Sequence, residues 1–150
     1  RELGPAYVGP GRGGAANAPL AFVAAAPGER HIFGPVMFAD QLRRLGWQVR
    51  LEISGEPEAT VTAARAVRPS AIGVSAGSRA TSGRLGALIA ALREAAPGAP
   101  VVLGGAWAAA DPEGAARIGA DRVARSPQDF EAAAAAAASR AGDALRAESP

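Results

Sequence analysis

Cysteine and lysine are absent from the 150-residue sequence, and histidine occurs once, at His31. Without cysteine the chain can form no disulfide, thiolate metal site or cysteine nucleophile. Without lysine, arginine supplies all 16 basic side chains, which stand against 14 acidic ones for a net charge of +2. Because these arginines form no basic stripe, we expect no direct DNA binding by this chain.

Aromatic residues make up only 5% of the chain although hydrophobic residues make up 49%, so alanine and the aliphatic residues must form most of the core. No apolar stretch approaches the length of a transmembrane helix, and residues 1–18 lack the apolar middle of a signal peptide. We therefore expect a cytoplasmic protein without a membrane partner. Because the sequence begins at Arg1 and its one methionine is Met37, we interpret it as a segment of a longer protein.

Glycine and proline are unevenly distributed along the chain. Residues 1–19 are rich in both and contain few apolar side chains, so this segment cannot bury enough surface to offset its ordering entropy. We predict a flexible linker at 1–19, one domain at 20–140 and a disordered tail at 141–150.

Hydrophobic patterns predict an alternation of strands and helices within the domain. Apolar or alternating segments predict strands at 20–26, 47–53, 71–75, 100–103 and 121–124. Amphipathic or alanine-rich segments predict helices at 35–45, 56–67, 84–95, 112–118 and 126–138. This alternation is typical of a doubly wound α/β fold with helices on both faces of a parallel sheet.

The composition of the strands predicts their order. The first, third and fourth strands are wholly apolar, as strands covered on both faces should be, whereas the second alternates and the fifth is short and charged. The flavodoxin-like order 2-1-3-4-5 puts the second and fifth strands at the edges. It also creates a switch point between the first and third strands, where open α/β sheets bind ligands. His31 and Ser75 then flank one crevice, with Gly104 and Gly105 one strand further along.

Three familiar functions of such a crevice fit these residues poorly. Gly73-Val74-Ser75-Ala76-Gly77 matches the Gly-x-Ser-x-Gly elbow of serine hydrolases, but His31 precedes the serine and breaks the usual chain order. A phosphorelay receiver would have an aspartate where Ser75 stands. A dinucleotide-binding fold would have Gly-x-Gly-x-x-Gly after the first strand, and residues 25–33 do not contain it.

Metal binding fits His31 better than these three functions do. A neutral imidazole is a common metal ligand, and Glu29, two residues away, could accept the other ring N–H and fix the tautomer. One histidine and one acid do not make a closed zinc site, so the remaining ligands would come from a cofactor such as a macrocycle. A solvated loop histidine with a capping role is the alternative.

Three short motifs resemble those of cobalamin-binding domains, which carry Asp-x-His-x-x-Gly, Ser-x-Leu and Gly-Gly on a flavodoxin-like fold. The segment Glu29 to Gly34 resembles the first motif with Glu in place of Asp, and Ser75 to Gly77 resembles the second with Gly in place of Leu. Gly104-Gly105 matches the third. The intervals are also close to the family pattern, with 40 residues between the first two motifs and 26 between the last two.

The resemblance implies a role for each of these residues. His31 would be the lower axial ligand of cobalt, in place of the cofactor's own dimethylbenzimidazole, and Glu29 would hold its second ring nitrogen. Thr81 or Ser82 would extend this relay. The displaced nucleotide tail would thread beside the sheet, where four glycines leave room for it: Gly34, Gly77, Gly104 and Gly105. Ser75 of the second motif would also belong to the cofactor-binding residues.

Glu-x-His preceded by Pro-Gly resembles light-sensing cobalamin regulators of the CarH type. The lack of a helix-turn-helix or helical cap within this sequence looks more like the AerR/PpaA antirepressors of photosynthesis genes. The resemblance implies a non-enzymatic module that binds adenosyl-, methyl- or hydroxocobalamin and acts on a protein partner such as a transcriptional repressor. Two alternatives remain open. One is a haem-binding redox or light sensor like the related domain of AppA-like proteins, and the other is the corrinoid-carrying part of a methyltransferase or mutase.

Overall fold

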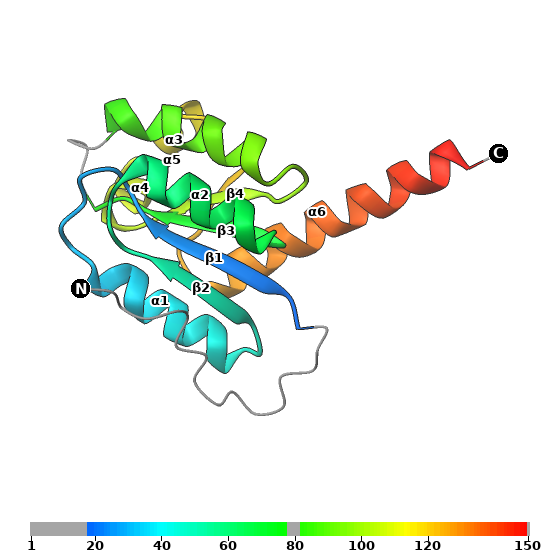
Figure 1. Ribbon diagram of the computed structural model, residues 1–150, viewed down its shortest axis with the longest axis horizontal. Helices are drawn as coiled ribbons and strands as arrows, with labels where there is room; N and C mark the ends of the chain where they lie inside the picture. The colour runs from blue at the N-terminus through cyan, green and yellow to red at the C-terminus, as the bar shows by residue number, and fades with distance from the viewer. Residues whose placement is uncertain (1–17, 78–81, 150) are drawn as a thin grey trace.

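A computed structural model describes residues 18–77 and 82–149 of the chain. Its core is one sheet of five parallel strands in the order β2-β1-β3-β4-β5, which confirms the predicted flavodoxin-like topology (Figure 1). The strands are β1 (Leu20–Ala25), β2 (Gln48–Glu52), β3 (Ala71–Ser75), β4 (Val101–Gly104) and β5 (Arg122–Val123).

Helices cover both faces of the sheet (Figure 1). They are α1 (Phe33–Arg44), α2 (Pro57–Val67), α3 (Ser82–Ala95), α4 (Ala106–Ala110), α5 (Pro112–Arg117) and α6 (Pro127–Glu148). Helices α1 and α6 pack on one face, and α2, α3, α4 and α5 pack on the other. No helix in the described part of the chain is long and apolar enough to cross a membrane.

The pleat of the central strands divides the core into two layers. On β1, Ala21 and Val23 face α1 and α6, whereas Phe22 and Ala24 face α2 and α3. Strand β1 has strands on both sides and helices on both faces, which explains why its sequence is apolar at every position. The alternating strand β2 lies at one edge, as its sequence predicts.

An aromatic cluster fills the layer beneath α1 and α6. The ring of Phe130 packs edge-to-face against Phe38, with 5.6 Å between ring centroids, and against Trp47, with 5.3 Å. Trp47 is buried, and its indole N–H donates a hydrogen bond to Glu131. Gly73 on β3 lies directly against the Phe130 ring, because a Cβ built on it would stand 3.3 Å from Phe130 Cε2.

Two elements differ from the sequence predictions. Helix α4 is an additional turn of five residues between β4 and α5, too short for its periodicity to be recognised. Helix α6 continues through residues 141–148, where the sequence predicts a disordered tail. Once the buried first turns of α6 have formed, each further residue adds one hydrogen bond, and the Ala, Leu and Arg residues of this stretch are good helix formers. Figure 1 shows this half of α6 extending beyond the edge of the sheet.

Candidate cofactor-binding site

The site begins at a tight turn that follows β1. Gly28 has a φ of +72°, a backbone conformation that favours glycine, and its N–H donates to the carbonyl of Gly55 at 3.2 Å. The N–H of Glu29 turns back to the carbonyl of Ala26 at 3.0 Å. These two bonds direct the Glu29 side chain into the molecule and the His31 side chain out of it.

Glu29 and His31 are paired as the sequence predicts. Oε1 of Glu29 lies 3.0 Å from Nδ1 of His31 and accepts the backbone N–H of His31, also at 3.0 Å. The Glu29 side chain is 4% exposed and the His31 side chain 90% exposed. An ionised carboxylate can only accept hydrogen bonds, so the proton of the neutral imidazole resides on Nδ1. Nε2 of His31 therefore keeps its lone pair and is available to a ligand or metal.

Hydrogen bonds keep the Glu29 carboxylate ionised. Burial by itself raises the pKa of Glu29, but the backbone N–H groups of His31 and Gly77 and the imidazole of His31 together outweigh it. The net effect lowers the pKa of Glu29 below its ordinary value. The carboxylate that orients the ring is consequently an acceptor across the neutral pH range.

Glu29 also connects two loops that are far apart in sequence. Its second oxygen, Oε2, accepts the backbone N–H of Gly77 at 2.7 Å. Gly77 follows β3, so this bond joins the turn after β1 to the backbone after the neighbouring strand. The approach requires glycine, because a Cβ at residue 77 would lie 2.9 Å from Oε2.

The other glycines named by the motifs lie along the carboxyl edge of the sheet. A Cβ on Gly34 would stand 3.7 Å from Oγ of Ser75, so these two residues face each other across the switch point between β1 and β3. Gly105 has a φ of +100°, and a Cβ there would overlap the carbonyl of Ala76. Gly34, Ser75, Gly104 and Gly105 all line one groove.

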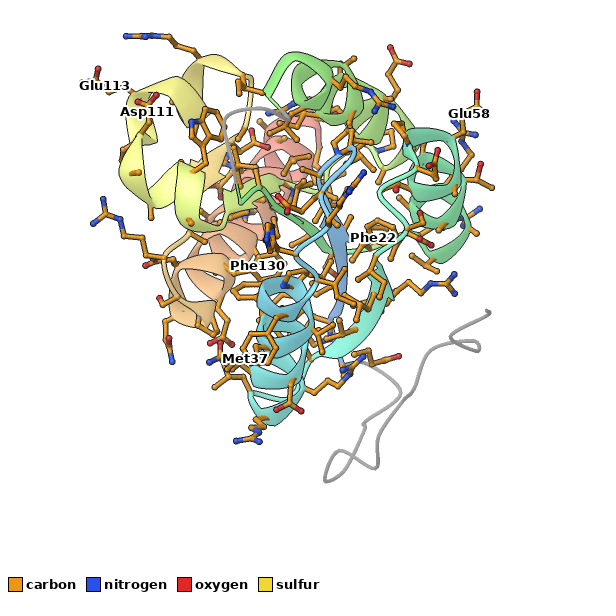
Figure 2. The ribbon with its side chains drawn as sticks, turned by 90° about the vertical axis from the view of Figure 1, so that its left-hand side faces the viewer. Phe22, Met37, Glu58, Asp111, Glu113 and Phe130 are labelled. Atoms are coloured by element: carbon orange, nitrogen blue, oxygen red, sulfur yellow. The ribbon has the colours of Figure 1, made fainter. Side chains whose placement is uncertain are left out.

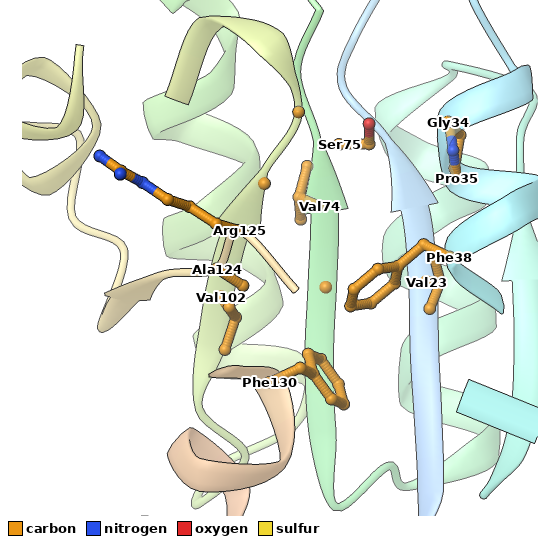
Figure 3. A pocket seen from close by; sticks show the side chains of 13 residues that line it. Val23, Gly34, Pro35, Phe38, Val74, Ser75, Val102, Ala124, Arg125 and Phe130 are labelled. Carbon is orange, nitrogen blue, oxygen red and sulfur yellow. The ribbon is translucent and has the colours of Figure 1, made fainter. Parts of the chain in front are cut away.

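This groove runs from the carboxyl edge down the face of the sheet between α1 and α6 (Figure 3). Its volume is about 130 Å³. Gly73, on strand β3 of the sheet, forms its floor. The rings of Phe38 and Phe130 close its inner end (Figure 3). Its remaining walls are Val23, Pro35, Val74, Val102, Ala124 and Arg125. The lining is therefore mostly apolar, with Ser75 near the mouth.

The structure places most of the predicted site residues together. His31, Glu29 and Gly77 form the hydrogen-bonded corner, and four further residues line the groove: Gly34, Ser75, Gly104 and Gly105. Gly77 contacts Glu29 and is not among the groove-lining residues. Thr81 lies outside the described residues, and of Ser82 only its place at the start of α3 is described.

Sequence reasoning missed the inner end of the groove. Phe38, Gly73 and Phe130 come from α1, β3 and α6, and only the folded chain brings them together. One signal was present, because a glycine inside an otherwise apolar strand often marks a site where another group approaches closely.

Exposed apolar side chains follow His31 along the chain, in the loop and the first turns of α1. Ile32, Phe33, Val36 and Met37 are 42%, 74%, 38% and 45% exposed, and Figure 2 shows Met37 projecting from the helix. They belong to the loop and the first turns of α1 that follow His31. Contiguous exposed apolar residues of this kind mark binding surfaces. The surface beside Nε2 of His31 thus suits a ligand with a large apolar face.

The B12 binding domain family matches residues 19–136 of the sequence. The chain belongs to this family. Its cofactor is a cobalamin or another corrinoid, which favours corrin over the alternative of haem. In this B12-binding domain the matched region runs from just before β1 into the buried half of α6 and includes the whole groove. Among curated proteins, no sequence matches the chain.

Two solved structures share the fold. A novel cobalamin-binding protein from Desulfitobacterium hafniense DCB-2 is 20% identical, with a TM-score of 0.66 over 75% of this chain. The monomethylamine corrinoid protein of Methanosarcina barkeri is 24% identical, with a TM-score of 0.56 over 81% of this chain. This B12-binding domain covers 56% of each of those two chains.

Proposed function

We propose that this B12-binding domain is a sensory module that reports the state of its cobalamin to a transcriptional partner, with His31 as the lower axial ligand of cobalt. The observation that carries the ligand assignment is the Glu29–His31 pair. It fixes Nδ1 as the protonated nitrogen and leaves Nε2 unprotonated on a ring that is 90% exposed. The exposed apolar side chains that follow His31 supply a surface for the corrin.

The groove supports binding of the cofactor with its own base displaced. When His31 takes the lower position, the nucleotide tail needs another place, and the groove begins at the same edge of the sheet. Its apolar inner end, formed by Phe38, Gly73 and Phe130, suits the flat aromatic base of the tail. Haem has no such tail and would leave the groove without a function.

Two features favour a regulator over an enzyme. The motif Glu-x-His after Pro27-Gly28 resembles light-sensing cobalamin regulators. The second is the chemistry of the cofactor, because bound alkylcobalamin would supply a cobalt–carbon bond that light can break and thus a change of state that a partner could receive. We therefore propose a partner protein, such as a transcriptional repressor, and no catalytic step by this chain.

A corrinoid carrier is the second candidate. One of the two solved structures described above is named as a monomethylamine corrinoid protein, so the same architecture serves a protein of that name. In this case the domain would present its cofactor to a separate catalytic domain, and light would not matter.

Substitution of His31 tests the ligand assignment. We expect the wild-type domain to bind hydroxocobalamin with a base-off, histidine-ligated absorption spectrum, and His31→Ala to lose that spectrum and at least about tenfold in affinity. Arg30→Ala, one residue away on the same turn, is the matched control and should keep both. An unchanged spectrum and affinity in His31→Ala would contradict the proposal.

Illumination separates the two candidates. A regulator loaded with adenosylcobalamin should change its absorption spectrum on illumination and change its retention by a partner or its oligomeric state at the same time. A carrier should show photolysis without either change. Repeating the measurement in the dark controls for cofactor loss.

A further inference from the structure

Glu29 and Gly77 occupy the two positions at which this chain departs from the motif pattern described above. The acid is one methylene longer than Asp, and residue 77 has lost its side chain. The structure places these two residues in direct contact, with the Gly77 N–H donating to Oε2 at 2.7 Å. The longer acid fills the space that a side chain at residue 77 would take.

The space between them is too small for even one added carbon. A Cβ on Gly77 would lie 2.9 Å from Oε2 and 3.3 Å from both Cδ and Oε1 of Glu29. Contacts of 2.9 Å to carbon do not persist, so one of the two groups would have to move. The φ of Gly77 is not positive, so an alanine at this position meets no left-handed backbone strain.

The Glu29 carboxylate cannot move without a loss of hydrogen bonds. It accepts three: the N–H of His31 at 3.0 Å, the ring Nδ1–H at 3.0 Å and the N–H of Gly77 at 2.7 Å. Its side chain is 4% exposed, so water would replace these partners only in part. Any displacement by a side chain at residue 77 therefore reaches the His31 ring.

We propose that Glu29 and Gly77 form one positioning unit, in which the absent side chain at residue 77 admits the longer acid and the acid in turn orients His31. Gly77 is then a positioning residue for the cofactor although its contact is with Glu29. This inference rests on the proposed ligand role of His31. It predicts that substitutions at the two positions have coupled effects.

A double-mutant cycle in hydroxocobalamin binding tests the coupling. Gly77→Ala should weaken binding at least about tenfold, as expected when a group that supports a metal ligand is disturbed. Glu29→Asp alone should weaken it less, because the shorter carboxylate withdraws from the Gly77 N–H but can still meet the ring. In Gly77→Ala with Glu29→Asp, the withdrawn carboxylate leaves room for the methyl group, and affinity should return to within about threefold of Glu29→Asp.

A matched glycine substitution controls for nonspecific effects. Gly86 lies on α3, away from the groove, and a Cβ there would make ordinary contacts of 3.7 and 3.8 Å with Ile118. Gly86→Ala should therefore leave cobalamin affinity unchanged. If Gly77→Ala binds as tightly as wild type, or if the double variant loses the product of the two single losses, the proposal is overturned.

The apo protein gives a readout that does not depend on cobalamin. His31 is the one histidine, so its ring nitrogens can be observed without assignment of other imidazoles. At alkaline pH, ¹⁵N shifts should report the Nδ1–H tautomer in wild type, a mixture of tautomers in Gly77→Ala and recovery in the double variant. If His31→Ala shows that the ligand assignment is wrong, these tautomer shifts still decide whether Glu29 and Gly77 act as a unit. A Gly77→Ala protein with the wild-type tautomer would overturn the coupling alone.

Discussion

At the residue scale, Glu29 differs from its exposed neighbours in its burial and in the number of hydrogen bonds that it accepts. A carboxylate buried to 4% exposure is costly unless its oxygens are satisfied, and here both are. One oxygen orients the imidazole, and the other joins the turn after β1 to the backbone after β3. A single side chain thereby sets the orientation of the His31 ring and part of the shape of the site.

Glu29 should make the stability of the apo protein depend on pH. Its pKa is lowered on folding from an unfolded value of about 4.5, so its contribution is present above that value and is lost as pH falls through the folded pKa. Urea denaturation should show wild type more stable than Glu29→Gln near neutral pH, with the difference shrinking below about pH 4.5. The comparison is best made with and without Glu29→Gln in a His31→Gln background, where the two backbone donors to Glu29 remain.

The control for this pH dependence is an exposed acid. Glu113 is 87% exposed and paired only with Arg117 on the surface of α5. Glu113→Gln should shift stability little at any pH, since exposed pairs contribute little. A stability difference between wild type and Glu29→Gln that stays constant down to strongly acidic pH would contradict the assigned role of the carboxylate.

At the element scale, the first and last turns of α6 differ in burial. Its first turns begin at Ser126, whose hydroxyl caps the helix by accepting the N–H of Asp129 at 3.2 Å. They then bury Phe130 against the sheet. Its last turns extend past the sheet with exposed side chains, including Leu145 at 68% exposure. The sequence identified the helix but not its end, because local propensity alone cannot tell how far a nucleated helix propagates.

Phe130 should be the residue of α6 on which folding depends most. Its ring is fully buried and contacts Phe38, Trp47 and Gly73. We expect Phe130→Ala to lower the free energy of unfolding by about 3–5 kcal/mol, because it leaves a cavity among three rigid neighbours. Leu145→Ala on the exposed half of the same helix should change it by less than about 0.5 kcal/mol. Chemical denaturation of both variants checks this, and equal effects would mean that the first turns of α6 are not anchored by this ring.

At the scale of the whole molecule, the strand order assembles the site. The apolar, alternating and charged strand sequences were enough to predict the order 2-1-3-4-5, and this order brings His31, Ser75 and Gly104 to one edge. The groove behind that edge could not be predicted in the same way. It depends on how Phe38 and Phe130 meet across Gly73, and packing between side chains from distant segments leaves no local pattern in the sequence.

The groove should distinguish corrinoids by their tails. A ligand that binds only the folded state stabilises it by RT ln(1 + [L]/Kd), about 2.7 kcal/mol at a hundredfold excess over Kd. In the proposed binding mode, cobalamin uses both His31 and the groove, whereas cobinamide, which lacks the nucleotide tail, uses only the edge of the sheet. Cobalamin should therefore raise the melting temperature of wild type more than cobinamide does at the same concentration.

A methyl group on the floor of the groove should remove most of that difference. In Gly73→Ala the new Cβ would stand 3.3 Å from the Phe130 ring and 3.7 Å from Phe38, so the rings would have to shift at the inner end of the groove, which the base of the tail would enter in the proposed binding mode. Protection by cobalamin should fall toward that by cobinamide, while protection by cobinamide should stay at its wild-type level. Gly86→Ala, remote from the groove, should preserve the full difference. If cobalamin and cobinamide protect wild type equally, the tail does not occupy the groove, and the apolar floor between Phe38 and Phe130 serves only the packing of α1 and α6.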